Sequence, residues 1–346
     1  MSVPTNARQP ADAPARVNRV DLVEFVGALL QEAGMGASDT RAVATALVDS
    51  DARGIDSHGV ARLPVYLDRI AAGGSSATAR PVVERENGAV AVVDGRDALG
   101  LVVGRFGMET ALRLAHQHGV GAVTCRRSGH FGAAAEFARM GPSRDCVTVS
   151  MTNVNVAMAP WGGITPLLGN NPVAVAAPTN GPPFVLDMAL STVARGKIRL
   201  AADGTATIDA HVALAGLITP LGGPKGSALA IAVDIFSALL SGAATSSDVK
   251  PQAALAEPQD VGHFFLALHV PAFVALEVFR ARIDQMLERI RSSTPASNFD
   301  KVLAPGDLER EAEERADREG ISLQRSTWLA LLAKAADLDV TAPALS

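Results

Sequence analysis

The chain has 346 residues, 48% of them hydrophobic and 19% charged, which is enough apolar material for about two domains. Its net charge of −5 argues against a nucleic-acid partner. Two cysteines, Cys125 and Cys146, are too few for a disulfide framework and favour a reducing compartment.

Neither export nor membrane insertion is expected from the hydropathy of the chain. Residues 1–17 lack the apolar core of a signal peptide and predict a disordered N-terminus. The longest apolar stretch, residues 227–243, is interrupted by Asp234 and is shorter than a membrane span. We therefore expect a cytoplasmic protein without a membrane partner.

Helical patterns begin at residue 19. Apolar residues recur at helical spacing up to Gly34, which ends the first predicted helix. A second helix is predicted over residues 38–54, with Ser38 or Asp39 as its N-cap.

A third helix is predicted to begin near Leu63, because Pro64 fits the first turn of a helix and not its interior. The residues before it, Ser57–Arg62, are then expected to form an irregular turn. Functional side chains often lie on such segments, held by a rigid element.

The pattern changes after about residue 80. Short valine-rich runs predict strands buried on both faces, over residues 89–95, 119–125, 146–154, 172–179 and 183–189. Helical stretches lie between them, so an α/β layered domain is predicted. Residues 227–241 predict an apolar helix packed inside.

The C-terminal part returns to helices, over residues 272–293, 306–320 and 326–338. We expect residues 18–75 and 285–346 to form one helical domain. The α/β domain, residues 76–284, would be inserted between its two halves.

The stretch "GIDSHGVAR", residues 54–62, is the first candidate reacting centre. His58 can give and take a proton near neutral pH, Ser57 can orient it, and Arg62 can hold a carboxylate with two parallel hydrogen bonds. The alternative is an N-cap serine beside a surface histidine.

Nucleotide-binding signals are incomplete. "GVGAVT" lacks the third glycine of a Rossmann fingerprint, and "GGPKGSA" is not a Walker loop. The glycine-rich turn around Lys225 nevertheless precedes a helix, whose N-terminus can bind phosphate. The alternative is a tight loop with a solvated lysine.

Further polar residues lie at predicted strand ends. His130 in "SGHFG" follows a buried strand and precedes a helix, where α/β sheets bind ligands; it could equally be a packed core residue. Asp187 ends an apolar strand, where a carboxylate is costly unless it is hydrogen-bonded. No clustered Cys/His spacing predicts a metal site.

Six of these segments occur in an order that resembles the malate/L-lactate dehydrogenase family of type 2. They are "RGIDSHGVARLPVYLDRI", "SGHFGAAAEFA", "LGNNPVAVAAPT", "VLDMALSTVARGKI", "LGGPKGSALA" and "VLAPGD". The resemblance covers residues 18–340. It implies a non-Rossmann, NAD(P)-binding three-layer α/β domain with a mixed sheet, plus a helical domain built from both chain ends.

The resemblance also implies roles for individual residues. Ser57 and His58 would form the acid/base element, with His130 as a second candidate proton donor, and Arg62 and Asn170 would bind substrate. The cofactor, NAD or NADP, would be bound by His130, Phe131, Gly132, Ala133, Ala134, Asn153, Asp187, Met188, Ala189, Lys225, Pro305, Gly306 and Asp307.

The resemblance implies a homodimer that interconverts a small 2-hydroxy carboxylate and its 2-oxo acid. Two alternatives are a cyclic imino acid reductase and a cofactor-binding homologue without activity. The chain departs from the family by lacking a connecting segment after Ala201, by Gly129 in place of asparagine, and by Lys197 where imine reductases have an aspartate.

Overall fold

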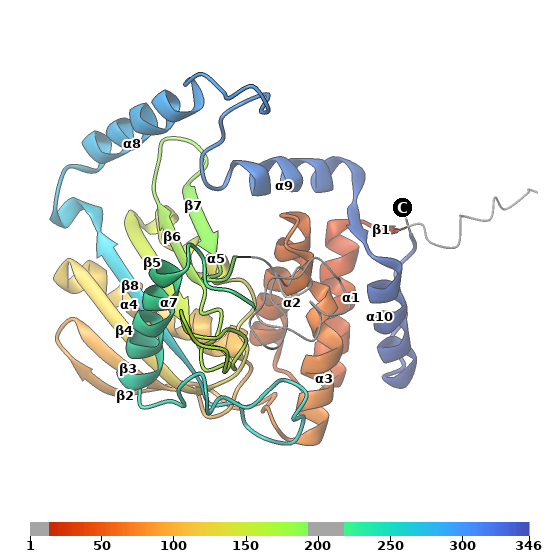
Figure 1. Ribbon diagram of the computed structural model, residues 1–346. Coiled ribbons are helices and arrows are strands. Elements are labelled where there is room, and N and C mark those ends of the chain that lie inside the picture. The colour runs from red at the N-terminus through yellow and green to blue at the C-terminus, as the bar shows by residue number, and fades with distance from the viewer. Residues whose placement is uncertain (1–13, 193–217, 346) are drawn as a thin grey trace, which may run out of the picture. The chain divides into compact units, whose positions relative to one another are not determined.

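The computed structural model describes residues 14–192 and 218–345 (Figure 1). The chain divides into two compact units. The first contains the residues up to Leu67 and those from Glu309, and the second runs from Asp68 to Leu308. The helix of residues 276–291 therefore falls entirely in the second unit, whereas the predicted boundary placed residues from 285 on in the helical domain. The predicted departures at Lys197 and after Ala201 lie outside the described residues.

Helices from both ends of the chain build the first unit. They are α1 (Arg19–Glu32), α2 (Ala37–Ala52), the start of α3 (Leu63–Ala72), α9 (Asp307–Glu319) from Glu309 on, and α10 (Arg325–Asp337). The predicted start of α3 at Leu63 is confirmed. The predicted N-cap of α2 is wrong, because Gly36 takes that position without a side-chain cap.

A two-stranded sheet pairs the two ends of the chain. Strand β1 (Ala15–Val17) runs antiparallel to β9 (Ile321–Leu323). Val17 is fully buried and Ala15 nearly so. The prediction of a disordered N-terminus is therefore wrong for residues 15–17. Three residues carry too weak a periodic signal to predict a strand whose partner lies about 300 residues away.

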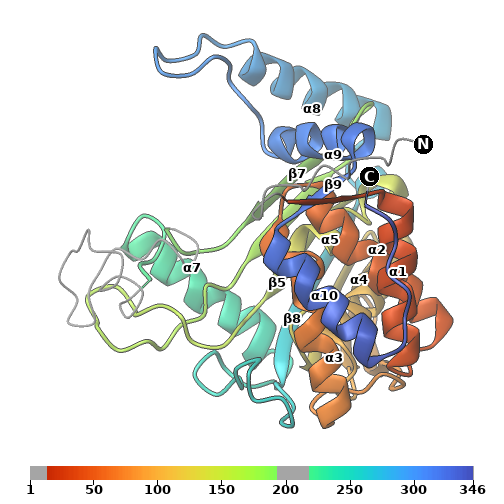
Figure 2. The same ribbon diagram turned by 90° about the vertical axis from the view of Figure 1, so that its right-hand side faces the viewer.

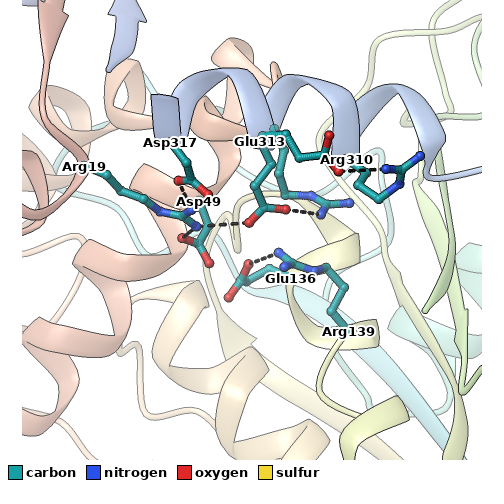
Figure 3. A network of polar contacts seen from close by, with 9 residues as sticks. Arg19, Asp49, Glu136, Arg139, Arg310, Glu313 and Asp317 are labelled. Carbon is teal, nitrogen blue, oxygen red and sulfur yellow. Dashed lines mark hydrogen bonds and ion pairs between the residues drawn. The ribbon is translucent and has the colours of Figure 1, made fainter. Parts of the chain in front are cut away.

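Ion pairs also join the N-terminal helices α1 and α2 to the C-terminal helix α9 (Figure 3). The guanidinium of Arg19 on α1 contacts Asp49 on α2 at 2.6 Å, and Glu313 and Asp317 on α9 at 3.1 and 2.7 Å. Glu313 also pairs with Arg53 at 3.0 Å. These charges are partly buried and share partners, so they stabilise more than isolated surface pairs.

The second unit is built on a seven-stranded mixed sheet with the order β2-β3-β4-β8-β5-β6-β7. β3 and β4 are parallel, and the other described pairs are antiparallel. The strands are β2 (Val82–Asn87), β3 (Val90–Asp94), β4 (Val120–Ser128), β5 (Cys146–Thr152), β6 (Val173–Ala177), β7 (Phe184–Met188) and β8 (Val261–His269). Five were predicted; β2 and β8 were missed.

Helices cover both faces of this sheet, which gives the expected three layers (Figures 1 and 2). On one face, α4 (Gly100–His118) and α5 (Ala134–Ala138) pack with β4, β6 and β8 around a core that includes Met108, Phe137 and Phe265. On the other face lie α7 (Pro224–Asp234), its π-helical continuation (Ile235–Leu239) and α8 (Leu276–Arg291).

Residues 224–239 form the predicted apolar helix, but the helix is not packed inside. Ala230 and Val233 are buried against the sheet. The opposite side leaves a set of large apolar side chains 40–61% exposed: Leu229, Ile231, Ile235, Phe236, Leu239 and Leu240. An apolar face of this extent marks an interaction surface in soluble proteins.

Candidate functional site

Two short 3-10 turns, Asp56–His58 and Val60–Arg62, join α2 to α3. This is the irregular segment predicted from Pro64. The two turns carry all three residues of the predicted reacting centre in the first unit.

Within this segment two hydrogen bonds connect the three residues. Ser57 Oγ lies 2.9 Å from His58 Nδ1, and Arg62 Nε donates to the Ser57 carbonyl oxygen at 2.6 Å. Ser57 is exposed, whereas His58 and Arg62 are partly buried. The imidazole and the guanidinium are thus fixed to the same turn.

Burial, and next the positive charge of Arg62, lower the pKa of His58 to about 4. The imidazole is therefore neutral at physiological pH and ready to accept a proton.

Asp51, in the last turn of α2, stabilises the 3-10 turns that follow it. It was not among the predicted site residues. Its Oδ2 accepts the Val60 backbone N–H at 2.7 Å. A Cβ at Gly59 would lie 2.2 Å from the Asp51 carboxyl carbon, so only glycine fits there. Burial raises the pKa of Asp51 from 3.8 to about 8. The signal in the sequence that could have identified Asp51 is an acidic residue at an apolar position of a helix, just before the predicted reacting centre.

The "SGHFG" segment follows β4 in the second unit. Its residues are mostly buried: Phe131 is 1% exposed and packs in the core against Phe137. His130 is partly exposed, and its Nδ1 accepts the Gly132 N–H at 3.3 Å. Gly132 has φ +81°, a conformation that favours glycine. The Phe131 and Ala134 side chains face the core, so these residues can offer a ligand only their backbone.

The amide of Asn153, which follows β5, is also committed to the protein. Its Nδ2 donates to Asp234 and to the Ala244 carbonyl, and its Oδ1 accepts from Gly262. Asn171 is fully buried in the same network, whereas its neighbour Asn170 is partly exposed. Asn170 is thus the more accessible side chain of the "GNNP" segment.

Asp187, at the end of β7, accepts the Ala135 N–H at 2.9 Å and so satisfies the first turn of α5. The next two predicted residues, Met188 and Ala189, are partly buried, and Met188 packs against the core under α7.

The loop Pro305–Asp307 lies against β7. A Cβ at Gly306 would come within 3.1 Å of the Val185 carbonyl oxygen. Asp307 is 4% exposed; it accepts the Ala304 N–H at 2.8 Å and binds Arg291 through two hydrogen bonds of 2.9 and 2.8 Å. Its carboxylate therefore has a structural role.

Lys225 is exposed in the first turn of α7, after a turn in which Gly222 and Gly223 have positive φ. Trp161 lies over this turn: its backbone N–H donates to Ser227 Oγ at 3.1 Å, and a Cβ on Gly223 would strike its ring at 2.8 Å. An exposed cation and backbone N–H groups at a helix start suit an anion.

The structure therefore assembles most of the predicted cofactor residues in the second unit, at the ends of β4, β5 and β7 and at the start of α7. No group of His, Cys, Asp or Glu side chains that could hold a metal ion occurs in residues 14–192 and 218–345. In the same described ranges, no helix is long and apolar enough to cross a membrane.

A mixed seven-stranded sheet with helices on both faces is also the fold of solved malate and sulfolactate dehydrogenases. Residues 17–332 match the family model of malate/L-lactate dehydrogenases. The chain belongs to this family.

Characterised relatives cover almost the whole chain. L-Sulfolactate dehydrogenase of Methanocaldococcus jannaschii is 35% identical over 314 residues, which are 87% of this chain and 90% of the relative. The structure of malate dehydrogenase from Pyrococcus horikoshii OT3 superimposes with a TM-score of 0.91 at 35% identity, over 97% of this chain and 99% of that chain.

Relatives name both nicotinamide cofactors. A (2R)-3-sulfolactate dehydrogenase (NADP(+)) of Chromohalobacter salexigens is 36% identical over 76% of this chain and 84% of its own length. Ureidoglycolate dehydrogenase (NAD(+)) of Escherichia coli K12 is 29% identical over 92% of this chain and 96% of its own. The cofactor is accordingly NAD or NADP.

Proposed function

We propose that this enzyme interconverts a small 2-hydroxy carboxylate and its 2-oxo acid. The observation that carries the proposal is the pair of adjoining 3-10 turns on which Ser57 contacts His58 Nδ1 and Arg62 donates to the Ser57 carbonyl oxygen. A proton carrier and a carboxylate ligand at this spacing match the two polar groups of such a substrate.

The protein groups would act as follows. In oxidation, neutral His58 accepts the hydroxyl proton through Nε2 while Ser57 orients the ring through Nδ1. In reduction, protonated His58 returns that proton to the oxygen at C2. Arg62 holds the substrate carboxylate. Hydride transfer to or from C2 would be the chemistry that NAD or NADP supplies when it is bound.

Substrate binding would also change the pKa of His58. The charge of Arg62 contributes to the low pKa of His58. A carboxylate bound to Arg62 offsets that charge, so it raises the pKa of His58 and favours the protonated form needed for reduction.

The second unit has the residues to hold a dinucleotide. Lys225 and the N-terminal N–H groups of α7 would bind phosphate. Gly132, with its positive φ, offers backbone to a close ligand, and partly exposed His130 would lie beside it.

The direct experiment is a panel of 2-oxo acids and cyclic imines with NADH and NADPH, followed at the nicotinamide absorbance. Turnover of a 2-oxo acid with a second carboxylate or a sulfonate is the expected result. Turnover of imines alone would indicate a cyclic imino acid reductase, and cofactor binding without turnover an inactive homologue.

Arg62→Lys keeps the positive charge but loses the planar fork. We expect KM for the carboxylate substrate to rise by about tenfold or more, with a smaller change in cofactor affinity. Steady-state kinetics with either nicotinamide measures both. An unchanged KM would remove Arg62 from the substrate site.

We also propose a cytoplasmic homodimer. The exposed apolar side chains of α7 and its π-helical continuation supply surface for a second copy. Size-exclusion chromatography with light scattering at micromolar concentration is expected to give twice the chain mass of 35.7 kDa. An active monomer would contradict the proposal.

A further inference from the structure

His263, at the start of β8, lies where two cofactor-binding segments meet and was not among the predicted site residues. Its neighbours across the sheet are Cys125 on β4 and Thr152 on β5. It is fully buried on the same sheet face as Phe265. It therefore stands beside the ends of both strands that precede the predicted cofactor residues.

Two hydroxyl groups hold the imidazole. Thr152 Oγ1 lies 2.8 Å from Nδ1, and Ser128 Oγ lies 2.7 Å from Nε2. Burial lowers the pKa of His263 to about 3, so the ring is neutral and has one donor and one acceptor nitrogen.

The surrounding carbonyl groups determine which nitrogen bears the proton. Thr152 Oγ1 donates to the carbonyl oxygens of Asn153 and Gly262, at 2.9 and 3.0 Å. It must then accept from Nδ1–H, which leaves Nε2 to accept the Ser128 hydroxyl proton. The chain of hydrogen bonds therefore runs in one direction, from Ser128 through His263 to Thr152.

The ring also supports the "SGHFG" segment by stacking. The imidazole lies 4.6 Å from the Phe131 ring at an interplanar angle of 11°. Ser128 and Phe131 flank Gly129 and His130, so His263 contacts this segment on both sides of these two residues. Gln259, just before β8, adds a third contact by accepting the His130 N–H at 3.1 Å.

We propose that His263 is a positioning residue for the cofactor: it holds Ser128 and Phe131 so that the backbone of "SGHFG" is in place before the nicotinamide binds. This inference rests on the proposed function of that segment. A preorganised loop pays less ordering entropy on binding, so loss of the support weakens the cofactor and leaves the chemical step largely intact.

The test uses His263→Phe, which keeps a ring against Phe131 and deletes both hydrogen bonds. We expect the Kd of NADH or NADPH, by fluorescence titration, and the cofactor KM to rise by about tenfold, with kcat at saturation within about threefold. Ser128→Ala is expected to raise the Kd in the same direction. The double variant should bind the cofactor no more weakly than His263→Phe alone, because both substitutions break the same hydrogen bond between Ser128 and His263.

Ala267→Gly is the control, since Ala267 is fully buried on the same strand. It should lower Tm without changing the Kd. A His263→Phe enzyme that loses Tm but keeps its Kd would overturn the proposal, as would a fall in kcat at unchanged Kd. If His263→Phe does not fold, an unchanged Kd in Ser128→Ala overturns it. A wild-type protein that binds neither nicotinamide would instead overturn the proposed function.

Discussion

Replacing His58 by alanine is expected to lower kcat by about 10²–10⁴-fold, the range for loss of a general acid or base. The neutral ring, oriented by Ser57 at Nδ1, is the group on this turn best suited to take the hydroxyl proton. Stopped-flow or steady-state measurement of nicotinamide absorbance gives kcat in both directions. The Kd of the cofactor should stay within about threefold, since the proposed role of His58 is toward the substrate.

The matched variant is His130→Ala. His130 Nδ1 already accepts the Gly132 N–H, so its removal should loosen the cofactor more than it slows proton transfer. A His58→Ala enzyme with near-normal kcat, beside an inactive His130→Ala enzyme that still binds cofactor, would reassign the proton donor to His130. The family membership would stand in either case.

Asp51→Asn is expected to change the dependence of stability on pH. The folded-state pKa of Asp51 is about 8, against 3.8 for an unburied carboxyl. Its contribution to stability is therefore fully present below pH 3.8 and is lost as pH rises through about 8. The loss amounts to roughly 1.4 kcal/mol for each pH unit between the two values. Asparagine cannot ionise, so the variant should gain stability relative to wild type as pH rises.

Urea unfolding of both proteins at pH 5.5 and 7.5 measures this difference. Asp56, whose negative charge also contributes to the raised pKa of Asp51, is present in both proteins. Parallel pH curves would contradict a neutral Asp51. The asparagine carbonyl can still accept the Val60 N–H, so kcat at pH 7 should change little, whereas Asp51→Ala should lower it by loosening the turn.

The sequence predicted those elements whose signals are local. Pro64 located the start of α3, and valine-rich runs located five strands. It missed β2, whose last four residues, 84–87, are all polar and exposed, and β8, in which Gly262 and His263 interrupt the apolar pattern. The helix at 224–239 was predicted correctly as a helix but placed wrongly, because an apolar composition does not distinguish a buried helix face from an exposed one.

The sequence motifs identified positions in the site but not the role of each side chain. A motif does not show whether a side chain contacts the ligand or is bonded within the protein. Asn153, Phe131 and Asp307 stand in predicted cofactor motifs, yet their side chains are taken up by the protein itself. Asp51 and His263 support the motifs from neighbouring elements, and their partners are 9 and 135 residues away in the chain. Contacts between separate segments of the chain produce no residue spacing that a sequence motif could reveal.

The pairing of β1 with β9 has a consequence for synthesis. Ala15–Val17 leave the ribosome about 300 residues before their partners Ile321–Leu323. The ion pairs of Arg19 with Glu313 and Asp317 depend on the same late segment. The α/β unit is complete in sequence before that segment exists, so the earliest-made part of the chain is the last to acquire its full set of partners. The turn that carries His58 lies in that late-finished unit, so its surroundings can close only after Ile321–Leu323 have been made.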